Sequence, residues 1–322
     1  MSTVPVGLTE KDIQRFEQGM AKCPSCGNWH DMDGLESLLE YDCQYCEDNV
    51  FCPMSISGFW LYAQTGEGGM GRVYLAQERD SSTVCAIKLS EYTDECDFRF
   101  QSLLYEGEIV EELIHPNIVR TYRFGYKAGK AFMLMDYISG ITLETCVLNY
   151  ALTEQRIVGW MLKLCDALSY MDKLGLLYRD LKPQNVIVDG EKLILLDFGL
   201  AVHKDYWNDI DEENLVGSPS YIPPERIEGK PEDIRSDIYA MGMLFYFIAS
   251  GKNYFEGSPE EIVEGHMTED RIPCQEALPE RSKEFNEILD RMITCNPLSR
   301  YQNYDEMHSA LEALEQSLMP IY

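Results

Sequence analysis

The chain has few basic residues. Of its 322 residues, 27 are Lys or Arg and 55 are Asp or Glu, which gives a formal charge of −28. Nucleic acids and anionic membranes are also negative, so this shortage of positive charge argues against nonspecific binding to either. We therefore expect neutral or basic partners, although an acidic surface can also serve solubility alone.

Long apolar runs, internal repeats and low-complexity tracts are also missing. The longest apolar run, residues 238–249, is interrupted only by Gly242 and is shorter than the roughly 20 residues that cross a bilayer. The start, MSTVPVGLTEKD, lacks the basic and apolar segments of a signal peptide. With 45% apolar and 25% charged residues, the composition is that of a folded globular chain. These features predict a soluble, cytoplasmic protein with no membrane partner.

The texture of the sequence changes along the chain. A short helix is expected near the start, capped by Thr9 and stopped by Gly19, with Ile13 and Phe16 on one side. A segment rich in Cys, Gly and Asp follows, then strands and turns from Phe59, then mainly helices. The predicted parts are an N-terminal helix (1–20), a cysteine module (21–57), a larger domain (58–316, with its lobes 58–137 and 138–316) and a tail (317–322).

Five of the eleven cysteines crowd between positions 23 and 52. Cys23 and Cys26 form one CxxC pair, Cys43 and Cys46 form another, and sixteen residues separate the pairs. Four thiolates at this spacing predict a tetrahedral Zn²⁺ site, and the segment resembles a zinc ribbon. His30 or Cys52 could substitute as a ligand. A redox-active CxxC is the weaker alternative, because no βαβ pattern surrounds it.

Many zinc ribbons bind nucleic acid, but this one lacks the charge for it. Up to residue 57 there are three basic residues, Lys11, Arg15 and Lys22, against ten acidic ones. Contacts to phosphate need Lys or Arg. A structural or protein-docking role is therefore expected, with no nucleic-acid partner.

A glycine-rich segment follows, with Gly66, Gly68 and Gly71 in a GxGxxG pattern. Dinucleotide-binding folds use the same spacing to open a helix. Here a strand pattern beginning at Val73 follows instead, which indicates a strand–turn–strand flap. Such a flap lets backbone N–H groups approach a phosphate without obstruction by side chains.

Lys88 lies in the apolar strand pattern Val84-Cys-Ala86-Ile-Lys88. A buried ammonium group needs a carboxylate partner or an anionic ligand. Glu106 is the candidate partner, because Leu103, Glu106, Val110 and Leu113 share one face of the next predicted helix. Glu108 points elsewhere. The alternative for Glu106 is a core carboxylate satisfied in another way.

Two polar clusters follow, and each adjoins an apolar strand pattern. The first is Tyr178-Arg179-Asp180-Leu-Lys182-Pro-Gln-Asn185, and Asp197-Phe198-Gly199 begins twelve residues after Asn185. Asp and Asn oxygens at strand ends suit Mg²⁺, which takes oxygen ligands and keeps phosphate and water in its shell. Pro223-Pro224-Glu225, Asp237 and Arg300 stand further on.

From about Gly58 to Leu314, these motifs together and in this order resemble a eukaryotic-type (Hanks-type) serine/threonine protein kinase. The resemblance implies an α+β, bilobal fold with a β-rich N-lobe and a helical C-lobe, and ATP and Mg²⁺ as cofactors beside the expected Zn²⁺. It implies that Gly66, Gly68 and Gly71 cover the ATP phosphates, and that Lys88, paired with Glu106, holds two of them. The remaining nucleotide contacts that it implies are Val73, Ala86, the gatekeeper Met135, and the backbone of Asp136 and Ile138 at the adenine.

The resemblance also implies the roles of the polar clusters. Asp180 orients the substrate hydroxyl and accepts its proton, Lys182 steadies the transferred phosphoryl group, and Asn185 and Asp197 hold magnesium. Lys182 further indicates Ser and Thr substrates on proteins. Glu225 and Arg300 match a structural ion pair of the family, and Asp237 matches the anchor under the catalytic loop.

Three positions depart from the family pattern. Tyr178 replaces the commoner His before Arg-Asp, Pro223 replaces the Ala of Ala-Pro-Glu, and Ser218 replaces a Thr. None of these changes removes a catalytic atom. An active kinase is therefore expected. The rival interpretations are a pseudokinase scaffold that binds partners through the zinc module, and a small-molecule kinase on the same fold.

Two further features leave alternatives open. Gly107 lies inside the helix that carries Glu106, either because the helix is easily displaced or because close packing admits only glycine. Between Phe198 and Gly217 there is no Ser or Thr. The resemblance makes Arg179 the residue that reads a phosphate on this segment. We expect Glu212 or Glu213 to stand in for that phosphate, helped by His203 or Lys204, unless the acidic loop is merely solvated.

Overall fold

The computed structural model describes residues 7–68, 71–90, 94, 96–203 and 217–319. The chain forms two compact units: residues 1–112 with 120–137 make the first, and residues 113–119 with 138–322 make the second. The expected N-terminal helix and cysteine module therefore belong to the same unit as the β-rich lobe.

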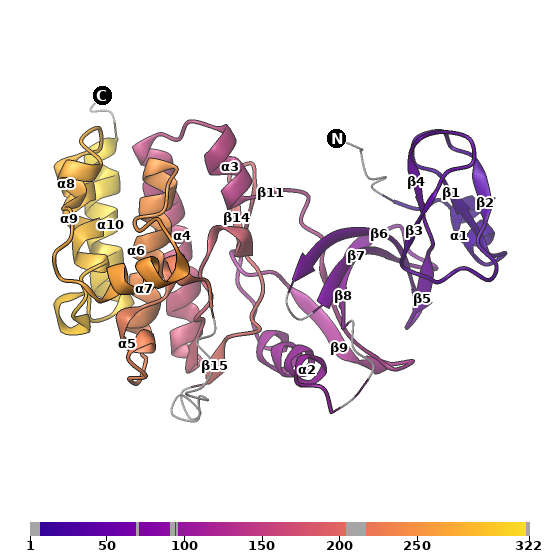
Figure 1. Cartoon of the computed structure of the whole chain (residues 1–322), viewed down its shortest axis with the longest axis horizontal. Helices are drawn as coiled ribbons and strands as arrows, with labels where there is room; N and C mark the ends of the chain where they lie inside the picture. The colour runs from indigo at the N-terminus through magenta and orange to yellow at the C-terminus, as the bar shows by residue number, and fades with distance from the viewer. Residues whose placement is uncertain (1–6, 69–70, 91–93, 95, 204–216, 320–322) are drawn as a thin grey trace. The chain divides into compact units, whose positions relative to one another are not determined.

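The first unit is mostly β-structure (Figure 1). Its largest sheet has six strands in the order β5-β6-β7-β8-β10-β9, all antiparallel to their neighbours. Its elements are α1 (Glu10–Phe16), β1 (Met20–Lys22), β2 (Trp29–Asp31), β3 (Glu40–Asp42), β4 (Asn49–Phe51), β5 (Met54–Ile56), β6 (Phe59–Gly68), β7 (Gly71–Glu78), β8 (Val84–Leu89), α2 (Phe98–Glu111), β9 (Thr121–Lys127) and β10 (Lys130–Asp136).

The N-terminal module consists of α1 and two small hairpins, β1–β2 and β3–β4. Thr9 caps α1 as predicted: its side chain accepts from the N–H of Asp12, and the carboxylate of Asp12 accepts from the N–H of Thr9, which satisfies donors that the first turn leaves open. The helix ends at Phe16, earlier than the expected residue 20. Its buried side chains are Ile13 and Phe16, the two that the sequence analysis placed on one side.

Side chains alternate between the two faces of the large sheet, because successive residues of a strand point in opposite directions. On β7, Tyr74 and Ala76 lie on one face and Leu75 on the other. Tyr74 and Ala76 join a cluster that includes Ile87 of β8, and Leu38 and Ile56 from the chain before β6 pack into it. This segment therefore covers the face opposite to Lys88.

The module also reaches the other face of the same sheet. Leu75 packs in a separate cluster with Phe16 of α1 and Tyr62 of β6, and Trp29 and Tyr137 lie against this cluster. Phe16 and Trp60 rings lie 5.5 Å apart between centroids. Because Tyr74 and Leu75 face opposite ways, the N-terminal region packs on both sides of β7.

The second unit is mainly helical (Figure 1). Helix α6 is buried along most of its length, begins at its Asp233 N-cap and ends at Gly251, which adopts the left-handed conformation that favours glycine. The elements of this unit are β11 (Ile141–Thr142), α3 (Leu143–Asn149), α4 (Glu154–Lys173), β12 (Leu176–Leu177), η1 (Pro183–Asn185), β13 (Val186–Asp189), β14 (Lys192–Leu195), β15 (Val202–His203), η3 (Pro219–Tyr221), α5 (Pro224–Ile227), α6 (Ile234–Ser250), α7 (Pro259–Met267), α8 (Cys274–Ala277), α9 (Lys283–Met292), η4 (Pro297–Ser299) and α10 (Tyr304–Leu318).

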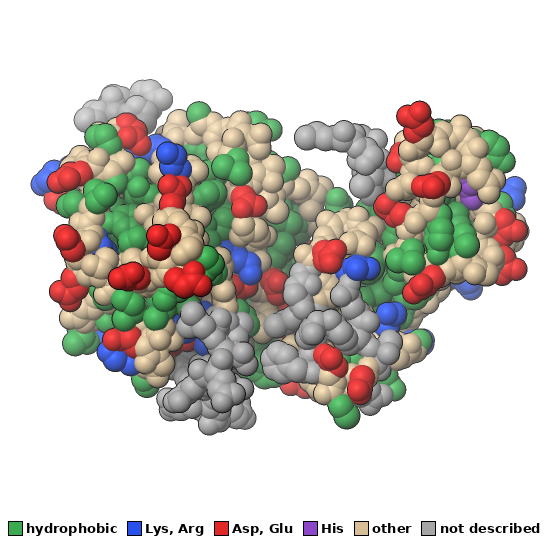
Figure 2. All heavy atoms as spheres, in the orientation of Figure 1, with side chains coloured by type: hydrophobic (Ala, Val, Ile, Leu, Met, Phe, Trp, Pro, Cys, Tyr) green, Lys and Arg blue, Asp and Glu red, His purple; other side chains and the backbone are tan. Residues whose placement is uncertain are grey.

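Within the described ranges, no helix combines the length and the apolar character needed to cross a bilayer. Acidic side chains are spread over the visible surface of the second unit, with no single red patch (Figure 2). On this face the acidic side chains are thus dispersed and not gathered at one place.

Candidate active site and metal centre

Lys88 and Glu106 form a buried ion pair in the first unit. Lys88 Nζ lies 2.7 Å from Glu106 Oε2, and the side chains are 6% and 0% exposed. Strand β8 presents Lys88, and helix α2 presents Glu106, whereas Glu108 is exposed as expected. The pairing inferred from the spacing is present. Helix α2 ends at Glu111, so Leu113 lies beyond the helix on which we had placed it.

The glycine-rich segment joins the ends of two paired antiparallel strands, and residues 69–70 between them lie outside the described residues. Gly66 and Gly68 end β6, and Gly71 opens β7. A Cβ on Gly71 would lie 2.1 Å from the carbonyl oxygen of Leu89, so the fold itself demands glycine there. A Cβ on Gly66 would meet only Val73 Cβ at 3.8 Å, an ordinary contact. Packing against the described residues thus leaves room for a side chain at Gly66.

The residues expected at the adenine lie along neighbouring strands and the chain after them. Val73 pairs with Lys88 between β7 and β8, and Ala86 pairs with Met135 between β8 and β10. Met135 is buried. Asp136 ends β10, and its N–H donates to the carbonyl of Arg120 at 2.9 Å. Ile138 is the first residue of the second unit after β10.

Asp180, Lys182 and Asn185 meet in the loop between β12 and β13. Lys182 Nζ is 2.7 Å from Asp180 Oδ2, and Asn185 Nδ2 donates to the same oxygen at 2.8 Å and to the Asp180 carbonyl at 3.0 Å. Burial raises the pKa of Asp180, although Lys182 and Asn185 favour its charged form. The carboxylate is thus held in place and desolvated.

Asp237 of α6 anchors the chain before Asp180. The Asp237 carboxylate accepts hydrogen bonds from the backbone N–H groups of Tyr178 and Arg179, each at 2.8 Å. Burial raises the pKa of Asp237 to about 6, against the opposing effect of these two hydrogen bonds. Arg179 adopts a left-handed backbone with φ 70°, an unusual conformation for a residue other than glycine. The anchor predicted for Asp237 is present.

Tyr178 contacts the chain on both sides of Asp197. Its hydroxyl donates to the carbonyl of Leu196 at 2.6 Å, and its buried ring packs edge-on against Phe198 at 5.3 Å. Tyr178 therefore holds the chain on either side of Asp197, which itself takes a left-handed φ of 55°. The tyrosine that departs from the family pattern supports the second polar cluster.

Glu225 and Arg300 form the other expected ion pair. Arg300 Nη1 and Nη2 donate to the two carboxylate oxygens of Glu225 at 2.8 and 2.9 Å, and the guanidinium is fully buried. Ser236 also donates to Glu225, at 2.5 Å. This bidentate pair ties α5 to the chain before α10.

The described acidic partner of Arg179 differs from the ones that the sequence predicted. Glu212, Glu213 and Lys204 lie outside the described residues. The described carboxylate at Arg179 is Glu232, which also binds Arg226. Glu232 stands in the stretch Lys-Pro-Glu-Asp, which looks like an exposed acidic loop. No periodicity or motif in the sequence signals that it is buried.

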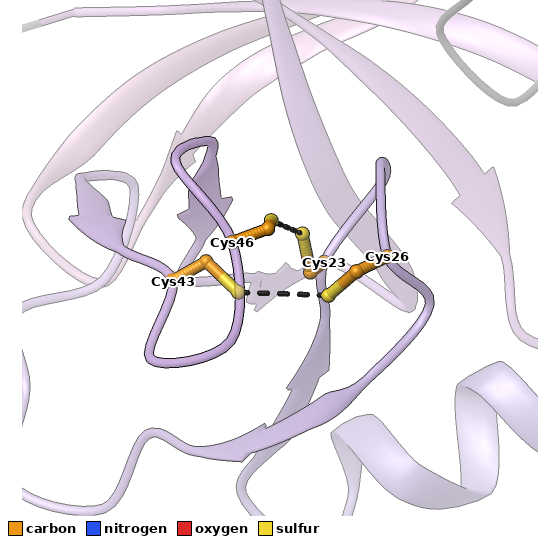
Figure 3. Close-up of side chains that lie close together, drawn as sticks. All are labelled: Cys23, Cys26, Cys43 and Cys46. Carbon is orange, nitrogen blue, oxygen red and sulfur yellow. Dashed lines mark hydrogen bonds between the residues drawn. The ribbon is translucent and has the colours of Figure 1, made fainter.

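The four predicted zinc ligands converge in the N-terminal module. Figure 3 shows Cys23 and Cys26 from one loop facing Cys43 and Cys46 from another. Cys23 and Cys46 sulfurs lie 3.6 Å apart, as do those of Cys26 and Cys43, and all four lie within 4.8 Å of one another. Zn–S bonds of about 2.3 Å in a tetrahedron place sulfurs about 3.8 Å apart. The donor set and its spacing therefore fit Zn²⁺.

The two alternative ligands lie beside this cluster. His30 Nε2 is 3.3 Å from Cys43 Sγ, and its ring packs against Tyr45. Cys52 is buried in the core of the module and is not part of the four-sulfur group. Among the residues that the structure describes, no cysteine forms a disulfide.

Comparisons with known proteins relate this chain to protein kinases. The family model described as "Protein kinase domain" matches residues 59–317. The serine/threonine-protein kinase PknD of Chlamydia pneumoniae is 32% identical over 77% of this chain. PknB of Mycobacterium tuberculosis is 29% identical over 76% of it, and pkn2 of Myxococcus xanthus 29% over 81%.

The chain spans only 30% to 41% of the length of these three relatives. The match thus concerns one domain of longer proteins. Because the family model covers most of this chain, and the Lys88–Glu106 pair and the Asp180 loop have the geometry described above, the chain belongs to the protein kinase domain family.

Proposed function

We propose that this protein is an ATP-dependent protein kinase that transfers the γ-phosphate to Ser or Thr hydroxyls of protein substrates. The observation that carries the proposal is the hydrogen-bonded set of Asp180, Lys182 and Asn185. It combines a buried carboxylate with an ammonium group and an oriented amide. The names of the relatives, all serine/threonine-protein kinases, support the substrate class.

In this proposal each unit has its own task. In the first, Lys88 presents its positive charge to the α- and β-phosphates, and Glu106 keeps it in place. Gly66, Gly68 and Gly71 let the backbone approach the phosphates. In the second, Asp180 orients the substrate hydroxyl and accepts its proton, and Lys182 stabilises negative charge on the transferred group. Val73, Ala86, Met135, Asp136 and Ile138 would surround the adenine.

Asn185 and Asp197 are the residues that would hold magnesium. Because Asn185 donates from Nδ2 to Asp180, the atom that its amide can offer to a metal is the oxygen, Oδ1. Asp197 offers carboxylate oxygens, and oxygen donors suit Mg²⁺. The bound ions would neutralise charge on the phosphates. The chain's part is to orient these oxygens next to Asp180.

We also propose that the four-cysteine cluster binds one Zn²⁺ with a structural role. The glycines lie in β6 and β7. The module pairs β5 with β6 and packs on both faces of β7. Phe51 of β4 contacts Tyr74 of β7, with ring centroids 6.0 Å apart. A segment this small cannot hold itself together by core burial alone, so metal binding would supply much of its stability.

The domain boundaries, the location and the partners of this protein are also proposals. We propose domain boundaries near residues 20, 57, 137 and 316, a cytoplasmic location, and protein partners without nucleic acid. The acidic balance of the N-terminal module supports the last point.

The decisive test of the kinase proposal is transfer of labelled phosphate from ATP to a generic basic protein. The wild type should label the protein, and Asp180→Ala should not. Asp270→Ala, which removes an exposed carboxylate of the second unit, is the control and should remain active. Labelling that is absent in the wild type, or equal in Asp180→Ala, would refute the proposal and favour a scaffold or a small-molecule kinase.

A further inference from the structure

Glu232 binds the guanidinium group of Arg179, the residue directly before Asp180. Arg179 Nε and Nη2 donate to Glu232 Oε1 at 3.1 and 2.8 Å. The side chains are 9% and 3% exposed. A charge pair this far removed from water is screened little by salt, and its geometry matters far more than that of a surface pair.

A second arginine completes the cluster from the other side. Arg226 Nε lies 3.0 Å from both oxygens of Glu232, and its Nη2 lies 2.7 Å from Oε2. Glu232 thus sits between two guanidinium groups. Burial alone would raise its pKa, but the charges and hydrogen bonds of Arg226 and Arg179 outweigh burial and lower it. The carboxylate is therefore charged at neutral pH.

The cluster joins three segments around the catalytic loop. Arg179 precedes Asp180, Arg226 lies in α5 directly after the Ser218–Glu225 stretch, and Glu232 lies before α6. Arg226 Nη1 also donates to the backbone carbonyl of Arg179 at 2.9 Å. Arg179 is thus held at its N–H by Asp237, at its carbonyl by Arg226 and at its side chain by Glu232. Its left-handed backbone requires such support.

We propose that Glu232 is a positioning residue for phosphoryl transfer: a built-in anion that holds Arg179, and through it the backbone of Asp180, without a phosphate on the segment between Phe198 and Gly217. The inference rests on the proposed kinase activity. A phosphate at Arg179 would bring about two negative charges and three acceptor oxygens. Here the described Nε and Nη2 donors of Arg179 already point at a carboxylate supplied by the fold.

Charge balance gives the reason why the acid matters. Without Glu232, the two guanidinium groups would lose the carboxylate that lies between them, and their mutual repulsion would be less compensated. In Glu232→Gln one acceptor oxygen remains, but the other becomes an NH2 donor beside guanidinium donors, and the side chain brings no charge. We therefore expect the loop to lose its fixed conformation near Asp180 while the nucleotide-binding residues of the first unit keep theirs.

The test uses the full chain, freed of phosphate by a phosphatase and checked by mass spectrometry. The phosphate-free wild type should be as active as untreated protein. Glu232→Gln should lower kcat at least tenfold with the KM for ATP unchanged, and Glu232→Asp should recover part of the loss. Glu228→Gln, which removes an exposed carboxylate from the same stretch, is the control and should behave as wild type.

A second measurement separates positioning from stability. Hydrogen–deuterium exchange over residues 178–185 should rise in Glu232→Gln and stay unchanged in Glu228→Gln. If Glu232→Gln does not fold, the double variant Arg226→Gln/Glu232→Gln removes one charge of each sign. It should fold, yet still exchange faster there and turn over more slowly.

Three results would overturn the proposal. The first is a wild type that loses its activity on phosphatase treatment. The second is a Glu232→Gln variant with unchanged kcat, whatever its melting temperature. The third is unchanged hydrogen exchange over residues 178–185 in both Glu232→Gln and Arg226→Gln/Glu232→Gln. Failure of the kinase proposal itself looks different, because then the wild type transfers no phosphate under either condition.

Discussion

The two compact units support their polar residues in different ways. In the first unit, Lys88 is paired with Glu106, and the strands around it are covered by a module built on four cysteines. In the second, the chain around Asp180 is held by buried charged groups: Asp237 accepts backbone hydrogen bonds, and Glu232 forms ion pairs with Arg179 and Arg226. The first unit thus carries a four-cysteine module, for which we propose zinc, whereas the second has charged groups within its core.

The largest effects are expected from the residues that act on phosphate. Lys88→Met, Asp180→Ala and Asp197→Ala should each reduce phosphoryl transfer by several orders of magnitude, measured with labelled ATP. Their effects on stability should differ. Lys88→Met leaves the buried Glu106 without its cation and should cost the first unit about 3 kcal/mol.

Asp180→Ala should cost much less stability, because it removes a carboxylate whose raised pKa shows that burial disfavours its charge. Denaturant unfolding of both variants measures the difference. Equal losses of stability would show that the two units do not differ in this way. Near-normal turnover in Asp180→Ala would refute the assigned roles.

The next largest effect should follow the loss of zinc. The purified, reduced protein should contain about one Zn²⁺ per chain, and Cys23→Ser should abolish binding and speed hydrogen exchange in β6 but not in α6. Cys52→Ser, in the same buried cluster, should retain the metal. Metal analysis that finds no zinc, or loosening of both units alike, would contradict a role confined to the first unit.

Two helix glycines offer a matched pair, one in each unit. A Cβ on Gly107 of α2 would lie 2.3 Å from Phe124 Cγ, so the close-packing alternative holds and Gly107→Ala should destabilise the protein by about 1–3 kcal/mol. A Cβ on Gly159 of α4 would meet only Glu315 Oε1 at 3.9 Å. Gly159→Ala should therefore stabilise by roughly 1 kcal/mol through helix propensity. Thermal unfolding of both variants checks the signs, and a stabilising Gly107→Ala would contradict the packing argument.

The smallest expected effect is a shift in pH dependence. Asp180 must be deprotonated to accept a proton, and burial raises its pKa, so kcat/KM should fall on acidification at a higher pH than an ordinary Asp would give. Lys182 lowers this pKa, so Lys182→Met should move the acid limb to still higher pH. Profiles of kcat/KM against pH for both proteins test the sign. An acid limb that moves to lower pH in the variant would exclude Asp180 as the titrating group.

Much of the site could be predicted because its chemistry leaves local marks. The CxxC pairs, the glycine spacing and the Tyr-Arg-Asp and Asp-Phe-Gly clusters are each a few residues long, and the spacing of Glu106 within an apolar stripe placed it opposite Lys88. Thr9 marked the start of α1 in the same way. The predicted ends of α1 and α2 lie beyond the observed ends, because neither helix is followed directly by proline or another strong stop signal.

What only the tertiary structure decided concerns partners far apart in the chain. The sequence alone identified the candidate site residues, since ligand type and short spacing are local properties. It did not show that Glu232 serves Arg179, 53 positions earlier, nor that Phe124 fills the space beside Gly107. It also did not show that the N-terminal region, with α1 and the cysteine module, packs on both faces of β7. Burial and pairing of this kind depend on which segments the fold brings together, and an exposed acidic loop and a buried anion can have the same local sequence.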